Sequence, residues 1–173
     1  MVEKVILISC AKTKRNTPSA AKDLYQSDLF QSMRRYAEEN ADTWYILSAK
    51  HGVLQPDTII EPYEKTLNQM PKAERLAWAE TVQETLVELI APGGMVTILA
   101  GKRYRENLIP FLEAHGHLVA VPMAGPPLGM QLRWLKSYEI PHTRRNAGRE
   151  NQLPTVTINR SQDGQRNHGG GTS

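Results

Sequence analysis

The sequence predicts an α/β fold, a three-layer sandwich built on a four-stranded, mainly parallel sheet. Short apolar runs alternate with longer segments in which apolar residues recur at helical spacing, a pattern typical of strands alternating with amphipathic helices. Strands separated by enough chain for a crossover helix form parallel pairs. The runs lack polar alternation, which indicates strands covered by helices on both faces.

The first half of the chain predicts two strands and one helix. The apolar run 5–9 predicts a strand, and a polar loop over 10–22 follows it. Residues 27–40 predict a helix with Ser27 as its N-cap. The inward positions of this helix are Leu29, Phe30, Met33 and Ala37. The run 44–48 predicts the second strand, and an extended loop follows it.

The second half predicts three helices and two strands. A helix over 72–90 begins after Pro71 and ends before a Pro-Gly-Gly sequence. Its expected inward positions are Leu76, Ala79, Val82, Leu86 and Leu89. The apolar runs 95–100 and 118–121 predict the remaining strands, with a helix over 104–115 between them. A last helix is predicted over 130–138.

Length and composition predict one domain and a tail. The 173 residues divide into an α/β catalytic domain over 1–140 and a basic, largely disordered tail over 141–173. The only cysteine, Cys10, forms no internal disulfide, and no apolar segment is long enough to span a membrane. We therefore expect a cytoplasmic monomer without a membrane partner.

The net charge of +3 comes entirely from this tail. Residues 1–140 hold equal numbers of basic and acidic side chains, whereas 141–173 hold five arginines against two acids. Arginine binds phosphate in a bidentate manner. The tail is therefore either a nucleic-acid arm or a solvated segment that only aids solubility.

Polar and cationic residues follow the first two predicted strands. Ser9, Cys10, Lys12 and Lys14 follow the first strand, and Ser48, Lys50 and His51 follow the second. The carboxyl ends of parallel strands meet at one edge of a sheet, where ligands bind. This pattern predicts a site for an anionic ligand. The first loop has no glycine, which excludes a phosphate-binding loop or dinucleotide fingerprint, so no cofactor is expected.

Two of these residues have alternative interpretations. Cys10 is either a nucleophile paired with His51 or a small buried residue, and a single cysteine without a close histidine pair predicts no metal site. His51 titrates near neutral pH and is either catalytic or structural. The histidines expected at the surface are His115, His117, His142 and His168.

The loop after the second strand and the end of the third add further candidates. Glu61 or Asp57 is the expected carboxylate for water activation, and we expect His51, Glu61 and Lys50 to form the catalytic group. The expected binding residues beyond the first two strand ends are Tyr25, Ser27, Tyr63, Gly101 and Arg103. Tyr25 or Tyr63 would stack on a base, and the helix beginning at Ser27 would attract an anion.

Four segments together resemble a largely uncharacterised family of bacteria and phages. They are Ser9-Cys10-Ala11-Lys12-Thr13-Lys14, Leu24-Tyr25-Gln26-Ser27-Asp28-Leu29-Phe30, Ile46-Leu47-Ser48-Ala49-Lys50-His51-Gly52-Val53-Leu54 and Pro62-Tyr63-Glu64-Lys65-Thr66-Leu67. The family is recognised by its Ser-Ala-Lys-His-Gly signature, and the resemblance covers nearly all of 1–138. The pattern is also distantly similar to the glycosylase-like domain of archaeosine synthase, which is similar to the uracil-DNA glycosylase superfamily.

This resemblance implies a uracil-DNA-glycosylase-like fold and cleavage of an N-glycosidic bond. The chain lacks a Gly-Gln-Asp-Pro-type loop after the first strand and a His-Pro-Ser element, so Glu61 or Asp57 would supply the carboxylate. We expect a metal-independent glycosidase that flips a damaged or modified base out of DNA, in repair or in defence against phage. The expected phosphate contacts are Lys12, Lys14, Lys50 and Arg103.

Two other functions use the same residues. One is a non-enzymatic module that binds DNA, RNA or a nucleotide through the basic edge of the sheet. The other is a nucleoside deoxyribosyltransferase.

Overall fold

The computed structural model describes residues 2–124, 133 and 135. Most of the helix predicted over 130–138 and all of the tail predicted over 141–173 lie outside the described residues. The domain boundary at 140 stays a prediction.

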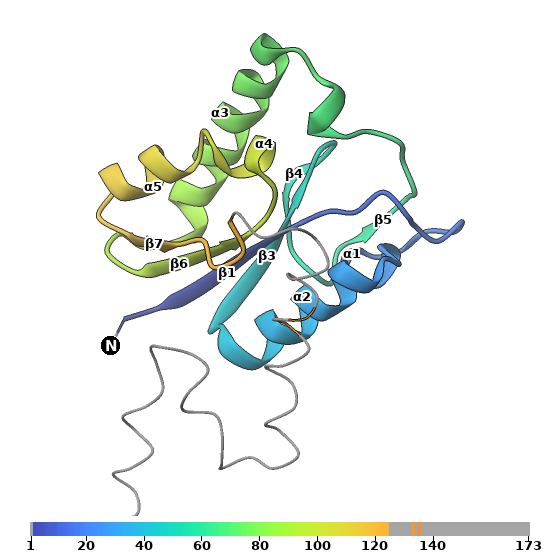
Figure 1. Cartoon of the computed structure of the whole chain (residues 1–173), viewed down its shortest axis with the longest axis horizontal. Coiled ribbons are helices and arrows are strands. Elements are labelled where there is room, and N and C mark those ends of the chain that lie inside the picture. The colour runs from blue at the N-terminus through green and yellow to red at the C-terminus, as the bar shows by residue number, and fades with distance from the viewer. Residues whose placement is uncertain (1, 125–132, 134, 136–173) are drawn as a thin grey trace, which may run out of the picture. The chain divides into compact units, whose positions relative to one another are not determined.

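A mixed five-stranded sheet forms the centre of the fold (Figure 1). In spatial order its strands are β4 (Gly52–Leu54), β3 (Thr43–Ser48), β1 (Lys4–Ser9), β6 (Met95–Leu99) and β7 (Leu118–Ala120). Four of them are parallel, and β4 is antiparallel to β3. The α/β class and the four predicted strands are confirmed. The expected four-stranded, mainly parallel sheet is wrong, because a fifth strand of opposite direction makes it mixed.

The antiparallel strand arises because the chain reverses directly after β3. Gly52 has a φ of 76°, a left-handed conformation that glycine adopts without steric cost. This turn pairs Ser48 with Gly52 and Ile46 with Leu54. With only three residues, β4 is too short to produce a periodic pattern in the sequence.

A second, two-stranded sheet joins two loops for which the sequence predicted no helix or strand. In it β2 (Ser19–Ala20) runs antiparallel to β5 (Ile59–Ile60), and the short helix α1 (Ala21–Leu24) follows β2. The backbone N–H of Ala21 donates to the carbonyl of Thr58 at 2.7 Å. The loop after β1 and the loop after β4 are therefore fixed to each other.

Helices lie on both sides of the main sheet (Figure 1). Alternate residues of β1 point to opposite faces, so Val5 and Leu7 join the core cluster that includes α3 (Lys72–Leu89), while Ile6 and Ile8 are buried on the other face. The helix α2 (Asp28–Asn40) packs against β1 on that second face. Ser27 caps α2 as predicted, since its Oγ accepts from the N–H of Phe30 at 3.0 Å.

The helix α3 confirms the helix predicted over 72–90. Not every residue that was expected to point inward is buried, however. Trp78, Ala79, Val82 and Leu86 are buried, whereas Leu76 is 41% exposed. The buried indole Nε1–H of Trp78 donates to the carbonyl of Ser48 at 2.9 Å. This bond fixes the end of β3 to the helix above it.

The helix predicted over 104–115 is divided into α4 (Lys102–Arg105) and α5 (Ile109–Ala114). Pro110 explains the break, because it has no N–H to donate to the carbonyl four residues earlier. Beyond α5, His117 is buried and its Nδ1 accepts from the N–H of Gly94 at 3.2 Å. The expectation of a surface position for His117 is therefore wrong, whereas His115 is exposed.

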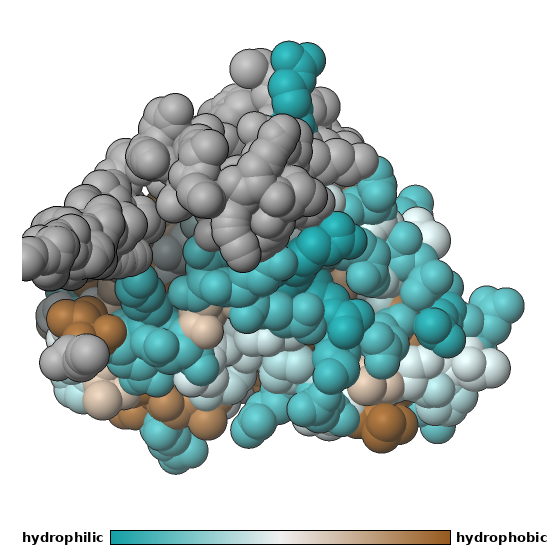
Figure 2. Space-filling model, turned by 90° about the horizontal axis from the view of Figure 1, so that it is seen from below, coloured by the Kyte–Doolittle hydropathy of each residue, from teal (hydrophilic) through white to brown (hydrophobic). Residues whose placement is uncertain are grey.

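The surface offers no continuous apolar patch in the view of Figure 2, where hydrophobic residues form separate spots in a hydrophilic surface. Within the described part of the chain, the helices are too short or too polar to cross a membrane.

Candidate functional site

The loops after β1, β3 and β6 meet at one edge of the main sheet. The N–H of Cys10 donates to the carbonyl of Leu47 at 3.0 Å, which holds the first loop against β3. Further along this loop, Lys14 forms an isolated antiparallel bridge with Tyr25. The short helix η1 (Leu67–Gln69) closes the other side, since the N–H of Leu67 donates to the Tyr104 hydroxyl at 3.3 Å.

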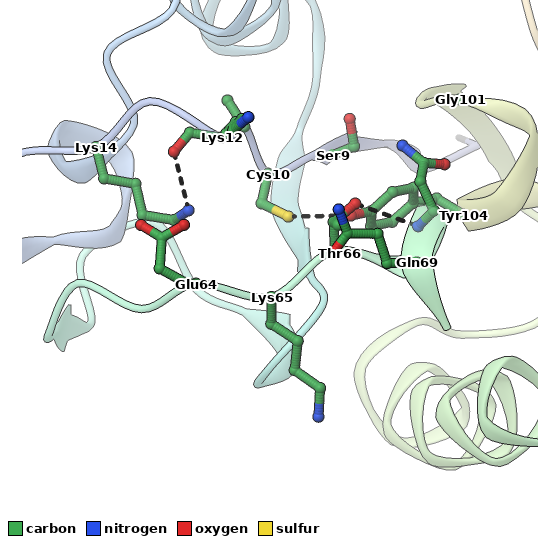
Figure 3. Close-up of a pocket in the computed structure, with 12 residues that line it drawn as sticks. Ser9, Cys10, Lys12, Lys14, Glu64, Lys65, Thr66, Gln69, Gly101 and Tyr104 are labelled. Carbon is green, nitrogen blue, oxygen red and sulfur yellow. Dashed lines mark hydrogen bonds between the residues drawn. The ribbon is translucent and has the colours of Figure 1, made fainter. Parts of the chain in front are cut away.

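An open pocket of about 480 Å³ lies between the loop after β1, the segment 64–69 and the residues that follow β6 (Figure 3). It is lined by Ser9, Cys10, Ala11, Lys12, Lys14, Glu64, Lys65, Thr66, Asn68, Gln69, Gly101 and Tyr104. Its volume falls in the range of pockets for small organic ligands. Lys14 and Glu64 extend toward one another in Figure 3, while the ammonium of Lys65 turns away and lies 3.7 Å from the Glu74 carboxylate.

Three buried hydroxyls form a hydrogen-bonded chain beside this pocket. The Ser48 Oγ accepts the N–H groups of Lys50 at 3.2 Å and His51 at 3.0 Å, so its own proton is donated to the Tyr63 hydroxyl at 2.8 Å. The Tyr63 hydroxyl is in turn hydrogen-bonded to the Tyr25 hydroxyl at 2.6 Å. Burial is the main cause that raises the pKa of both phenols well above the usual range, so both stay protonated.

Cationic side chains gather around the Tyr63 ring. The Nζ of Lys14 lies 4.6 Å from the ring centroid, and the Nζ of Lys50 lies 6.0 Å from it. The imidazole of His51 meets the same ring edge-on, with centroids 5.5 Å apart. Partial burial of the His51 ring, followed by the charge of Lys50, lowers the pKa of His51 below its usual 6.5. The imidazole is therefore neutral at pH 7.

The thiol of Cys10 faces a phenol. Its Sγ lies 3.6 Å from the Tyr104 hydroxyl. Burial, with the adjacent Cys10 as the second cause, raises the pKa of Tyr104 well above its usual range. No cluster of three metal-ligating side chains is present among the residues that the structure describes.

The residues predicted for the site divide into two adjoining groups and a remainder. Those that line the pocket are Ser9, Cys10, Lys12, Lys14 and Gly101. Those that form or flank the hydroxyl chain are Tyr25, Ser48, Lys50, His51 and Tyr63. Lys14 belongs to both groups, because it lines the pocket and lies over the Tyr63 ring.

The other predicted residues lie away from the pocket lining. Ser27 is used as a helix cap, and Arg103 lies 4.0 Å from Glu106. Glu61 is exposed, and exposed Asp57 pairs with Lys22 at 2.7 Å. Stacking of Tyr25 on a base is inconsistent with the structure, because its ring is completely buried.

Several pocket residues are absent from the sequence prediction. They are Glu64, Thr66, Asn68, Gln69 and Tyr104, whereas Lys65 was a possible phosphate ligand from the sequence. Glu64 lies in the same loop as Glu61, so their position in the sequence did not show which of the two carboxylates would line the pocket. Tyr104 was placed in a helix, although it closely follows the end of β6 and so lies at the same edge of the sheet as the predicted site.

Comparisons with known proteins identify relatives without a known activity. A family described as a family of unknown function (DUF6884) matches residues 5–137. An uncharacterised protein, YfjM of Bacillus subtilis (strain 168), is 31% identical over 130 residues, which cover 68% of this chain and 82% of that protein. No solved structure matches significantly. These matches agree with the resemblance to an uncharacterised family and do not bear on the glycosylase-like similarity.

Proposed function

This chain belongs to the DUF6884 family of unknown function, and we propose from its pocket that it is an N-glycosidase that releases a damaged or modified base from DNA. One observation carries the proposal: a single pocket combines groups suited to the three parts of a nucleotide. Its lining includes three lysines, of which Lys65 turns its ammonium away (Figure 3), one carboxylate and two side-chain amides.

The ammonium groups suit the phosphate. Lys12 and Lys14 line the pocket, and neither forms an ion pair with a carboxylate among residues 2–124. Lysine binds phosphate as a point charge, and an ammonium without a carboxylate partner breaks no ion pair when phosphate arrives, although Lys14 also donates to the Lys12 carbonyl at 3.1 Å.

The amides suit the base. Asn68 and Gln69 are exposed and line the same pocket. Each amide offers both a donor and an acceptor, which matches the edge of a nucleobase. A flipped base could therefore be read here without an exposed aromatic ring.

The carboxylate suits the sugar. Cleavage of an N-glycosidic bond builds positive charge on the sugar ring, which a carboxylate stabilises while it orients the attacking water. Glu64 lines the pocket, whereas Glu61 does not. We therefore assign this role to Glu64 in place of Glu61 or Asp57.

The test is base release from oligodeoxynucleotides that carry normal or modified bases, measured as alkali-labile abasic sites. Replacing Glu64 by Gln is expected to lower the release rate by about 100-fold or more, as for loss of a general acid or base. Glu61→Gln is the matched control, since it alters an exposed carboxylate of the same loop outside the pocket. Loss of activity in Glu61→Gln with full activity in Glu64→Gln would contradict the assignment.

A second function, binding of nucleic acid without cleavage, is favoured by the exposure of Glu64. Catalytic carboxylates are commonly shielded from water to tune their proton affinity. Tight binding of DNA without release of any base supports this function. Activity on free nucleosides alone would instead indicate a deoxyribosyltransferase.

A further inference from the structure

A second group of nitrogen-bearing side chains lies largely outside the pocket. Lys50 and His51 follow β3 and do not line the pocket, but both lie beside Tyr63, as Lys14 does. Three nitrogen-bearing side chains from two separate loops thus surround one ring. Lys14 is the residue that the pocket and this second group share.

The Tyr63 ring, beside which this second group lies, is buried and hydrogen-bonded in place. Tyr63 is only 7% exposed, and its hydroxyl is fixed between Ser48 at 2.8 Å and Tyr25 at 2.6 Å. Attraction between an ammonium and the face of an aromatic ring favours both lysine positions. The backbone N–H groups of Lys50 and His51 are fixed as well, because both donate to the Ser48 Oγ.

Among the described residues the lysines of this group form no direct ion pair, and the Glu64 carboxylate extends toward Lys14 (Figure 3). The ammonium groups of Lys14 and Lys50 lie 4.6 and 6.0 Å from one ring centroid. An anion that binds beside the Tyr63 ring would be attracted by both ammonium groups. The neutral imidazole of His51 adds an N–H donor at the same place.

We propose that Lys50 and His51, together with the shared Lys14, form a second phosphate subsite, so that the substrate is a nucleotide inside a strand with a phosphate on each side. This inference rests on the proposed function, because it takes the pocket to hold the nucleotide. A free nucleoside has no phosphate, and a mononucleotide would fill only one of the two subsites. The enzyme would therefore act on polynucleotide and discriminate against free nucleosides and mononucleotides.

The test compares binding of the four common deoxynucleoside 3′,5′-bisphosphates with binding of the matching 5′- and 3′-monophosphates, by calorimetry at one low salt concentration. At least one bisphosphate is expected to bind 10-fold or more tightly than either of its monophosphates. Lys50→Gln should remove this advantage, so that the bisphosphate binds no more tightly than the tighter of its monophosphates. Lys14→Gln should weaken both kinds of ligand, because both subsites use it.

Two controls make the result specific. Lys72→Gln removes an exposed lysine outside the pocket lining and should preserve the bisphosphate advantage. In the unaltered protein, the pKa of His51 followed by NMR should rise when bisphosphate binds, because an adjacent anion favours the imidazolium. Equal affinity for bisphosphate and monophosphate, no detectable binding of either, or no change at His51 would overturn the inference.

The two proposals can fail separately. If base release from DNA depends on Glu64 but bisphosphates have no advantage, the second subsite is wrong and the glycosidase proposal stands. If the advantage depends on Lys50 but no base is released from any strand, the subsite stands and the glycosidase proposal fails.

Discussion

At the scale of single residues, Ser48 connects the backbone to the site. It is fully buried, accepts two backbone N–H groups and donates to Tyr63. The bond to Tyr63 is buried and the two bonds from the backbone are partly buried, so loss of the Ser48 hydroxyl leaves these groups with one partner fewer. One hydroxyl therefore links Tyr63 to the backbone of Lys50 and His51.

Replacing Ser48 by Ala is expected to lower the free energy of unfolding by about 1–3 kcal/mol, since one buried hydroxyl and two partly buried N–H groups lose a partner. Urea denaturation measures this. Ser19→Ala is the matched control: its hydroxyl donates to the Thr17 carbonyl in an exposed loop, and its change should stay within about 0.5 kcal/mol. Equal effects of the two substitutions would contradict the role of Ser48.

The titration of His51 gives a second prediction at this scale. Its pKa in the folded protein lies below the usual 6.5, first because of burial and second because of Lys50. Below about pH 6.5 the unfolded chain therefore takes up the proton first, and the contribution of His51 to stability decreases as the pH falls toward its folded pKa. Above pH 6.5 His51 is neutral in both states and contributes nothing.

Removing the charge of Lys50 should raise the pKa of His51 partway toward its usual value of 6.5. In Lys50→Met, the pKa of His51 measured by NMR is expected to rise but to remain below 6.5, because burial is the larger cause and persists. Lys72→Met, which removes an exposed charge at the start of α3, should leave the His51 titration unchanged. An unchanged pKa in Lys50→Met would mean that the two side chains do not interact.

At the scale of elements, the connection from α3 to β6 depends on close backbone packing. A Cβ added at Gly94 would lie 2.9 Å from the Glu3 carbonyl oxygen, a backbone atom at the start of β1. The same segment carries the bond from the Gly94 N–H to His117. Glycine is therefore needed here for space rather than for a left-handed conformation.

Gly94→Ala is expected to destabilise the fold by about 1–3 kcal/mol, the usual cost of overpacking, measured as a shift in the urea midpoint. Gly101→Ala is the matched control, because nothing lies within 4 Å of its added Cβ and its φ of −68° suits any residue. That control should change stability by no more than about 0.5 kcal/mol. Comparable losses in both variants would refute the steric argument.

At the scale of the whole molecule, charge is unevenly distributed along the chain. The five arginines of 141–173 supply the excess positive charge, whereas 1–140 is balanced. Long-range attraction of DNA scales with released counterions, so these arginines would strengthen binding without sequence preference.

Replacing all five arginines by Gln in the full chain is expected to reduce the slope of log Kd against log salt concentration by about 0.9 for each arginine that contacts phosphate in duplex DNA. Fluorescence anisotropy with one labelled duplex measures the slope. The control replaces the same arginines by Lys, which keeps the charge and should largely keep the slope. An unaltered slope in the Gln variant would indicate a tail that aids solubility only.

The sequence predicted the main parallel strands and the cap of α2 correctly because these depend on local patterns. Apolar runs identified β1, β3, β6 and β7, and a serine at the start of an apolar periodicity identified the α2 N-terminus. Short strands such as β4 and β5 were missed, because two or three residues have no detectable period. Their formation depends on a tight turn and on a partner loop distant in sequence.

For the site, the sequence by itself determined that lysines, a histidine and hydroxyls follow the strands and share one edge of the sheet, since parallel strands end on the same side. Only the tertiary structure decided which of them line the pocket. Glu64 lines the pocket and Glu61 does not, although both are exposed acids of one loop. The orientation of a side chain is set by what the backbone packs against, and that contact comes from distant parts of the chain.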